Sequence, residues 1–222
     1  MPFGNASLTV GRIVLIAVVL LGWCLPASAQ EADARLPVPA PAVQAKSSAL
    51  VRELYQEEFD RIITRSQRGK VAGKLIDQAV ATRQDPTGRY VLLDVAMRTA
   101  VDAGDVAKAF LAIDELARYY RVDGWESRTA VLTRMAESAK RKIERQTLAA
   151  SALRAIDGAI DGNDYPIAER LVEVALEAAK QARDGELIRQ IAAKADAVKK
   201  AAEAERALQD VLAMLRQKPV DP

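Results

Sequence analysis

The sequence contains no histidine, a single cysteine and few aromatic residues. Without histidine, the chain cannot form a Ser-His-Asp or Cys-His catalytic site, and it has no side chain that titrates near neutral pH by default. Because Cys24 is its only cysteine, internal disulfides, thiolate zinc sites and iron–sulfur clusters are excluded as well. The composition therefore excludes the sites that depend on histidine or on paired cysteines, and it does not identify a chemical reaction.

The first 29 residues have the features of a secretory signal peptide. Arg12 precedes an apolar stretch over residues 13–25, and Ala27 and Ala29 then follow the small-x-small pattern of a cleavage site. The stretch is short against the roughly 20 residues that a membrane-spanning helix needs. We expect cleavage between Ala29 and Gln30 and a secreted or periplasmic protein; if uncleaved, the segment would be the only part of the chain in the membrane.

Positive and negative side chains are almost balanced. The chain has 32 lysines and arginines against 30 acidic residues, and the signal peptide accounts for one basic and no acidic residue. The densest basic run, residues 140–142 with Arg145, is flanked by Glu137 and Glu144. This balance argues against a dedicated polyanion-binding protein, and we predict no nucleic-acid partner.

A short proline-rich segment precedes the main part of the chain. Residues 36–42 alternate proline with small or apolar residues, which favours an extended polyproline II conformation. We predict a linker over residues 30–46, a helical domain over 47–218 and a tail over 219–222.

The domain has the hydrophobic pattern of an all-α protein. Between residues 42 and 218 the only prolines are Pro86 and Pro166, and apolar residues recur every three or four positions. In the last helix, Glu205 interrupts the apolar seam, so a sustained coiled coil is not expected. The predicted helices cover residues 50–63, 71–80, 90–103, 105–120, 123–139, 148–161, 164–179 and 184–216.

Two helical hairpins overlay when the sequence is shifted by 59 residues. Residues 96–105 then match residues 155–164, and both turns have the form Asp-x-x-Asp with a glycine inside. We expect the glycine to end the first helix in left-handed geometry and the second aspartate, Asp105 or Asp164, to cap the next helix. Residues 103–109 and 162–168 both resemble the central turn of a tetratricopeptide hairpin, although an additional helix lengthens the period beyond the usual ~34 residues.

A wider resemblance covers most of the domain. Residues 85–93, 103–105, 113–117 and 120–123, together with Ala109, resemble a degenerate tetratricopeptide-like region that follows the signal peptide in secreted planctomycete proteins. It runs from about residue 47 to 219, is most specific over 85–123, and belongs to proteins of largely unassigned function. It implies antiparallel helical hairpins stacked as a short array that ends in a long C-terminal helix.

The resemblance also implies a set of residues for contact with a partner. In a tetratricopeptide-like hairpin, the first helix lines the concave side of the array. Apart from the resemblance, Tyr119, Tyr120 and Trp125 are expected at one inter-helix corner, either as partly exposed anchors, since aromatic residues dominate binding hot spots, or packed in the core. The candidate partner-binding residues are Asp94 and Arg98 in the first hairpin, Leu153 and Asp157 in the second, and Tyr119 and Trp125.

The acidic residues near position 160 invite a calcium hypothesis, which their spacing does not support. A calcium loop starting at Asp161 requires an oxygen ligand at its fifth position and a glutamate at its twelfth, where the chain has Tyr165 and Val172. Turn formation and helix capping explain these acids better. We predict no metal and no cofactor.

Three functional hypotheses remain. The first is an exported, non-catalytic interaction or scaffolding module that binds an unknown protein in the envelope or outside the cell. The second is a cell-wall or carbohydrate-active enzyme, which would need two carboxylates about 5–10 Å apart in a cleft with aromatic platforms. The third is a structural spacer that self-associates through its last helix.

Overall fold

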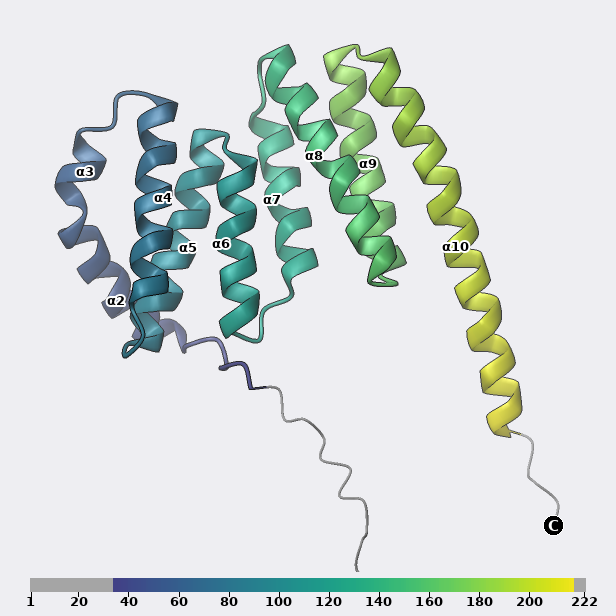
Figure 1. Cartoon of the computed structure of the whole chain (residues 1–222), viewed down its shortest axis with the longest axis horizontal. Helices are drawn as coiled ribbons and strands as arrows, with labels where there is room; N and C mark the ends of the chain where they lie inside the picture. The colour runs from purple at the N-terminus through teal and green to yellow at the C-terminus, as the bar shows by residue number, and fades with distance from the viewer. Residues whose placement is uncertain (1–33, 218–222) are drawn as a thin grey trace, which may run out of the picture. The chain divides into compact units, whose positions relative to one another are not determined.

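The computed structural model describes residues 34–217, and within them the chain is α-helical with one isolated β-bridge and no strand. The all-α fold and the long C-terminal helix are thereby confirmed (Figure 1). The signal peptide, its cleavage site and the tail lie outside the described residues. The helices are α2 (Pro41–Leu54), α3 (Gln56–Asp60), α4 (Arg65–Ala81), α5 (Pro86–Ala103), α6 (Val106–Tyr119), α7 (Gly124–Ser138), α8 (Lys142–Asp161), α9 (Tyr165–Ala182) and α10 (Gly185–Gln217).

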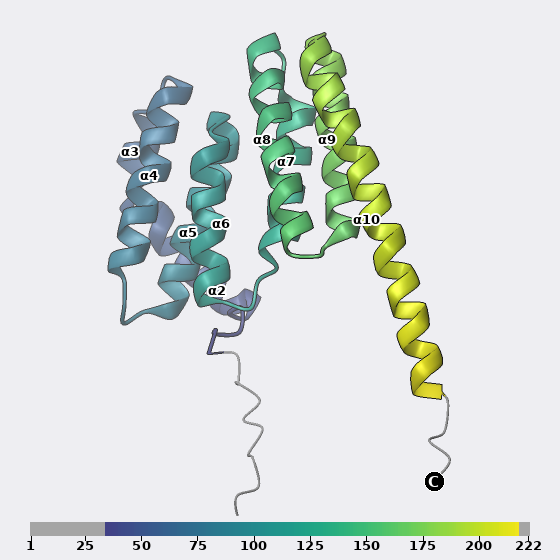
Figure 2. The ribbon, with the colours of Figure 1, turned by 45° about the vertical axis from the view of Figure 1, so that its right-hand side comes forward.

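From α4 onward, consecutive helices run antiparallel and alternate between two layers (Figures 1 and 2). One layer contains α4, α6, α8 and α10; the other contains α2, α5, α7 and α9. Within the layers, α4 contacts α6, α8 contacts α10, and α2, α5, α7 and α9 form an unbroken series of neighbours. No extensive backbone contact joins α6 to α8. The first layer is therefore open between these two helices.

The N-terminal boundary differs from the predicted linker of residues 30–46. Helix α2 already begins at Pro41, where a missing backbone N–H costs nothing because the first helical N–H groups have no intrahelical acceptor. Before it, the Leu36 N–H donates to the Tyr119 carbonyl at 2.8 Å and the Leu36 carbonyl accepts from the Arg121 N–H at 2.8 Å. This part of the predicted linker is thus pinned to the C-terminal end of α6.

The predicted helix over residues 50–63 is interrupted. It divides at Tyr55, which leaves helical geometry, and α3 is only one turn long. Ile63, the last residue of the predicted helix, lies between α3 and α4 and is 88% exposed. The Thr64 hydroxyl accepts from the Gln67 N–H at 3.2 Å and the Gln67 side chain accepts from the Thr64 N–H at 2.9 Å. This capping box starts α4 at Arg65, before the second predicted helix of residues 71–80.

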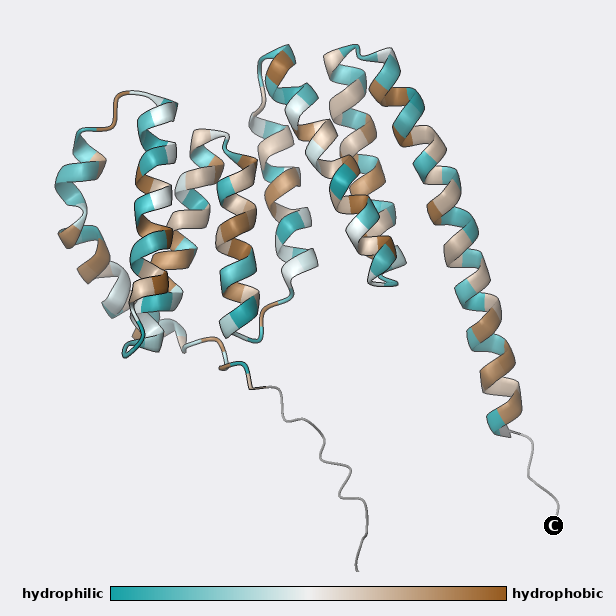
Figure 3. Ribbon diagram, in the orientation of Figure 1, coloured by the Kyte–Doolittle hydropathy of each residue, from teal (hydrophilic) through white to brown (hydrophobic). Residues whose placement is uncertain are grey.

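The core is rich in alanine and forms two adjoining clusters. One lies mainly among α6–α10 and includes Leu132, Ile156 and Leu171; the other lies among α2, α4, α5 and α6. Met97 packs against both. Burial ends along α10 at Ala202, whereas apolar residues continue to the C-terminal end of that helix (Figure 3). Among residues 34–217, no helix has the length and hydropathy required to cross a bilayer.

Candidate functional site

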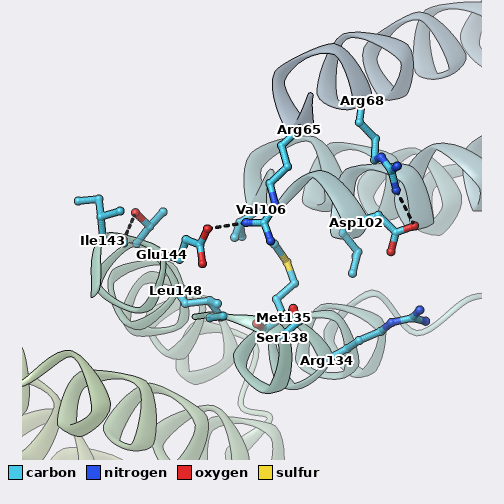
Figure 4. A pocket seen from close by; sticks show the side chains of 14 residues that line it. Arg65, Arg68, Asp102, Val106, Arg134, Met135, Ser138, Ile143, Glu144 and Leu148 are labelled. Carbon is cyan, nitrogen blue, oxygen red and sulfur yellow. Dashed lines mark hydrogen bonds and ion pairs between the residues drawn. The ribbon is translucent and has the colours of Figure 1, made fainter. Parts of the chain in front are cut away.

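The opening between α6 and α8 is a groove with α7 along one wall. It consists of two adjoining cavities of about 500 and 790 Å³, both bordered by Arg65, Gly104, Val106 and Thr147. We call it the α4–α8 groove, lined from within residues 65–70, 101–110, 125–139 and 143–155. Figure 4 shows its smaller cavity, with α4 side chains facing those of α7 and α8.

A tryptophan lies at one end of the groove because α8 carries a glycine opposite it. Trp125 is half-buried and packs against the core. A Cβ atom at Gly158 would overlap the indole ring, with Cζ2 only 2.9 Å away. The glycine therefore lets the ring lie directly on the α8 backbone.

Basic side chains are concentrated in the groove although the chain as a whole is nearly neutral. Seven cationic and three acidic side chains line it. The nearly balanced net charge, which argues against a dedicated polyanion-binding protein, does not reveal this local excess. The cationic residues are Arg65, Arg68, Lys70, Lys108, Arg128, Arg134 and Arg154, and the acidic ones are Asp102, Asp105 and Glu144.

All three carboxylates are already engaged. Asp105 accepts from the Lys108 ammonium at 2.6 Å and also caps α6. Asp102 lies 3.6 Å from Arg68, and Glu144 pairs with Arg65. The acids therefore bind neighbouring cations and helix ends and leave no facing pair of free carboxylates in the groove.

Three of the cations have no such partner. Within residues 34–217, Lys70, Arg134 and Arg154 form no ion pair, and the Arg154 guanidinium donates only to the Ser151 hydroxyl at 3.1 Å. They come from α4, α7 and α8 respectively, and all three side chains are exposed. Positive charge is thus available to a ligand from three helices.

Arg128 is held in a fixed orientation between two aromatic rings. Its guanidinium carbon lies 4.5 Å from the Trp125 ring centre and 5.5 Å from that of Phe110, and it pairs with Asp114. Its Nε is buried without a hydrogen-bond partner. These cation–π contacts cover one face of each ring.

One ion pair spans the groove from α4 to α8 (Figure 4). Glu144 accepts from the backbone N–H of Arg141 at 3.1 Å and of Lys140 at 3.0 Å, from the Arg141 side chain, and from Arg65. The Arg141 backbone hydrogen bond contributes most, and together these donors lower the pKa of Glu144 to about 2. Glu144 thereby fastens the first turn of α8 to α4.

Asp94 and Arg98 lie together, but in the opposite layer. Arg98 pairs with Asp94 at 3.0 Å, one turn apart on α5. Both border a separate cavity of about 770 Å³ between α5 and the pair α2–α3. Burial raises the pKa of Asp94, against the lowering effect of Arg98.

The structure separates the other two predicted concave-face residues from this pair. Leu153 packs against the core, and Asp157 pairs with Lys194 of α10 at 2.5 Å. Because consecutive helices alternate between the layers and α8 is the third helix after α5, the first helices of the two hairpins fall in opposite layers. The expectation that Asp94, Arg98, Leu153 and Asp157 project toward one surface is therefore wrong.

The expected aromatic corner is also divided. Tyr119 lies between the guanidinium groups of Arg89 and Arg118, at 4.4 and 5.4 Å. Tyr120 is buried, and its hydroxyl donates to the Pro86 carbonyl at 2.5 Å. Both belong to the N-terminal core cluster, whereas Trp125 belongs to the other.

Of the six predicted partner-binding residues, only Trp125 lines the α4–α8 groove. The sequence does not reveal the groove cations, because they are spread over residues 65–154 and only the fold brings them together. The Arg141-x-x-Glu144 spacing indicates the capping interaction at the start of α8, but not the ion pair of Glu144 with Arg65 on α4.

The acidic residues near position 160 act in turns and ion pairs. The Asp164 side chain caps α9 by accepting from the Ile167 N–H at 3.2 Å, and Asp157 is paired with Lys194. In the described part of the chain, no group of three or more acidic, histidine or cysteine side chains is arranged to hold a metal ion.

These features define an all-α protein of two helical layers with a basic groove open in one of them. Comparison with protein-family models, with curated proteins and with solved structures finds no match.

Proposed function

We propose that this chain is an exported, non-catalytic helical module that binds a partner protein in the α4–α8 groove. The observation that carries the proposal is the set of unpaired cations, Lys70, Arg134 and Arg154, beside the half-buried Trp125. Charged groups around an interface steer and orient a partner, and large side chains such as tryptophan and arginine supply much of the affinity.

The arrangement of the acidic residues favours binding over catalysis. A glycosidase mechanism needs one carboxylate that donates a proton and a second that acts on the other side of the bond. In the groove, Asp102, Asp105 and Glu144 are held by cations and helix N-termini, and the low pKa of Glu144 is the opposite of what a general acid requires.

The export of the module and its tetratricopeptide-like character rest on sequence features. The N-terminal residues supply the charged start, apolar run and cleavage pattern of a signal peptide. We expect the protein purified from its native host to begin at Gln30, which N-terminal mass spectrometry can establish. A mature chain beginning at Met1 in the cytoplasmic fraction would contradict export.

Site-specific crosslinking tests the groove as the binding site. A photo-crosslinking residue at Thr147, exposed in the groove, should form a discrete adduct with another polypeptide in the native host. The same residue at Lys199, on the exposed side of α10, serves as the control. No adduct from Thr147, or the same adducts from both positions, would contradict the proposal.

A second candidate function is self-association through the end of α10. Five large apolar residues are exposed there: Leu208, Val211, Leu212, Met214 and Leu215. Light scattering over a range of concentrations tests this function, because a self-associating spacer would gain mass with concentration and a purely monomeric module would not.

A further inference from the structure

We infer that the ligand of the α4–α8 groove is an extended acidic peptide segment with an apolar residue among its carboxylates. This inference rests on the proposed function and specifies its partner. Its first support is the charge of the lining, because three unpaired cations from three different helices surround the space. A ligand that supplies carboxylates would complete the pairing that the protein leaves open.

The length of the groove suits an extended chain. Along α8 the lining runs from Ile143 to Ala155, which is about 18 Å at the helical rise of ~1.5 Å per residue. An extended peptide advances ~3.3 Å per residue, so about five residues would fill this length. Such a segment would pass Arg134 in the smaller cavity and then Lys70 and Arg154 in the larger one.

The lining also has an apolar part that fits a peptide side chain. Ile143, which is 62% exposed, borders the smaller cavity together with the buried Met135, Val106 and Leu148. An acidic segment with one leucine or similar residue could place that side chain there and its carboxylates on the flanking cations. Free phosphate or another small anion would leave the exposed Ile143 side chain in water.

The aromatic residues of the groove do not form a platform for nucleic-acid bases. Single-stranded nucleic acids bind by stacking bases on exposed aromatic faces. Trp125 lies against Gly158 on α8 and under the guanidinium of Arg128, and Phe110 contacts the same guanidinium. Because the Arg128 guanidinium already covers one face of each ring, the basic groove favours an acidic peptide over a nucleic acid.

The test measures binding of labelled peptides by fluorescence anisotropy to the purified chain. The probe is a peptide with the central sequence Glu-Glu-Leu-Glu-Glu, and Lys-Lys-Leu-Lys-Lys is its charge-reversed counterpart. We expect saturable binding of the acidic probe only, weakening with added salt because the attraction is electrostatic. Binding of a uridine decamer more tightly than the acidic probe would overturn the inference in favour of a nucleic acid.

Charge reversal locates the binding. Lys70→Glu and Arg154→Glu replace exposed residues without an ion pair, so folding should be retained, as circular dichroism can verify. Each should weaken binding of the acidic probe about fivefold to tenfold, since an attraction is replaced by a repulsion. The matched control, Lys199→Glu with Lys200→Glu on the exposed side of α10, should change affinity less than about twofold. Equal losses in control and groove variants would overturn the inference.

The same variants separate this inference from the proposed function. If the Thr147 adduct forms in the native host and survives Lys70→Glu and Arg154→Glu, the groove binds a partner but not through acidic residues. If no adduct forms at all, the proposed function itself fails.

Discussion

The hairpins α5–α6 and α8–α9 have the same turn but occupy opposite positions in the stack. In the first, the Asp105 N–H donates to the Ala100 carbonyl at 2.9 Å; in the second, the Asp164 N–H donates to the Ala159 carbonyl at 2.9 Å. Yet α5 lies in the layer of α7 and α9, and α8 in the layer of α10. Local sequence therefore fixes the turn, whereas the number of intervening helices fixes which surface a hairpin presents.

The two hairpins also differ at equivalent positions, 59 residues apart. Thr99 on α5 is buried and its hydroxyl donates to the Val95 carbonyl at 2.7 Å, whereas its counterpart Gly158 makes room for Trp125. At the turn, Gly104 has a φ of 75° and its counterpart Asn163 a φ of 57°. At each of these positions, the residue of one hairpin can be replaced by its counterpart from the other.

The largest effect is expected where the second hairpin is given the side chain of the first. Gly158→Thr would drive Trp125 from its position, because a Cβ alone already overlaps the ring. Overpacking of this kind costs about 1–3 kcal/mol, and we expect the upper part of that range in urea unfolding, together with a change in tryptophan fluorescence.

The reverse exchange is the control for that variant. Thr99→Gly should cost about 1 kcal/mol for glycine in a helix interior, without a change in the environment of Trp125. An unchanged unfolding midpoint in Gly158→Thr would show that the indole does not depend on the glycine.

A smaller effect is expected at the helix caps. Asp164→Ala should lower the free energy of unfolding by about 1 kcal/mol, because it removes the acceptor for the Ile167 N–H. Asp105→Ala should cost somewhat more, since that carboxylate also binds Lys108 at 2.6 Å. Thermal unfolding measures both, and Asp105→Asn and Asp164→Asn should retain most of the stability because asparagine is an equally good cap. Equal losses in the Asn and Ala variants would contradict a capping role.

Substitutions at the left-handed turn positions should change the stability of the chain in opposite directions. Gly104→Ala is expected to destabilise by about 1 kcal/mol, because an alanine at positive φ is strained even where space is available. Arg183 occupies the same kind of position at the end of α9, with a φ of 53°. Arg183→Gly should therefore stabilise by up to about 1 kcal/mol, and Asn163→Gly by less, because asparagine tolerates this geometry. The order of the three melting temperatures is the measurement, and a stabilising Gly104→Ala would contradict it.

These turns show how far the sequence can predict the fold. The caps Asp105 and Asp164 and the break after α8 follow from local chemistry and are confirmed. The expectation that glycine adopts the left-handed conformation in both turns is right for Gly104 and wrong for Gly162, whose φ is −84° because Asn163 takes that role. Either residue can do so, and the local pattern does not select between them.

The groove depends on information that no single segment contains. The unpaired cations Lys70, Arg134 and Arg154 come from three helices. They border an open groove because α6 and α8 do not pack together. Periodicity identifies each helix and its buried face, but it does not specify which helices become neighbours across a layer. The four residues predicted from the helix arrangement therefore lie elsewhere. Trp125, which was predicted as an aromatic residue and not from that arrangement, lines the groove.

The smallest expected effect on stability concerns the ion pair between Arg65 and Glu144, which joins α8 of the second hairpin to α4. Because donors from Arg141, Lys140 and Arg65 lower the pKa of Glu144 from 4.5 to about 2, its ionised form stabilises the folded chain. That stabilisation is complete above pH 4.5 and is lost as the pH falls through about 2. Glu144→Gln should therefore destabilise by less than about 1 kcal/mol near pH 7, since the pair is partly exposed.

The pH profile distinguishes this electrostatic role from simple packing. The difference in unfolding free energy between the unmodified chain and Glu144→Gln should shrink from pH 5 to pH 2, because protonation makes the two side chains alike. Glu137→Gln is the matched control, because Glu137 is exposed on α7 and forms no ion pair within residues 34–217. If the Glu144→Gln difference stayed constant over this range, the attachment of α8 to α4 would not depend on the charge of Glu144.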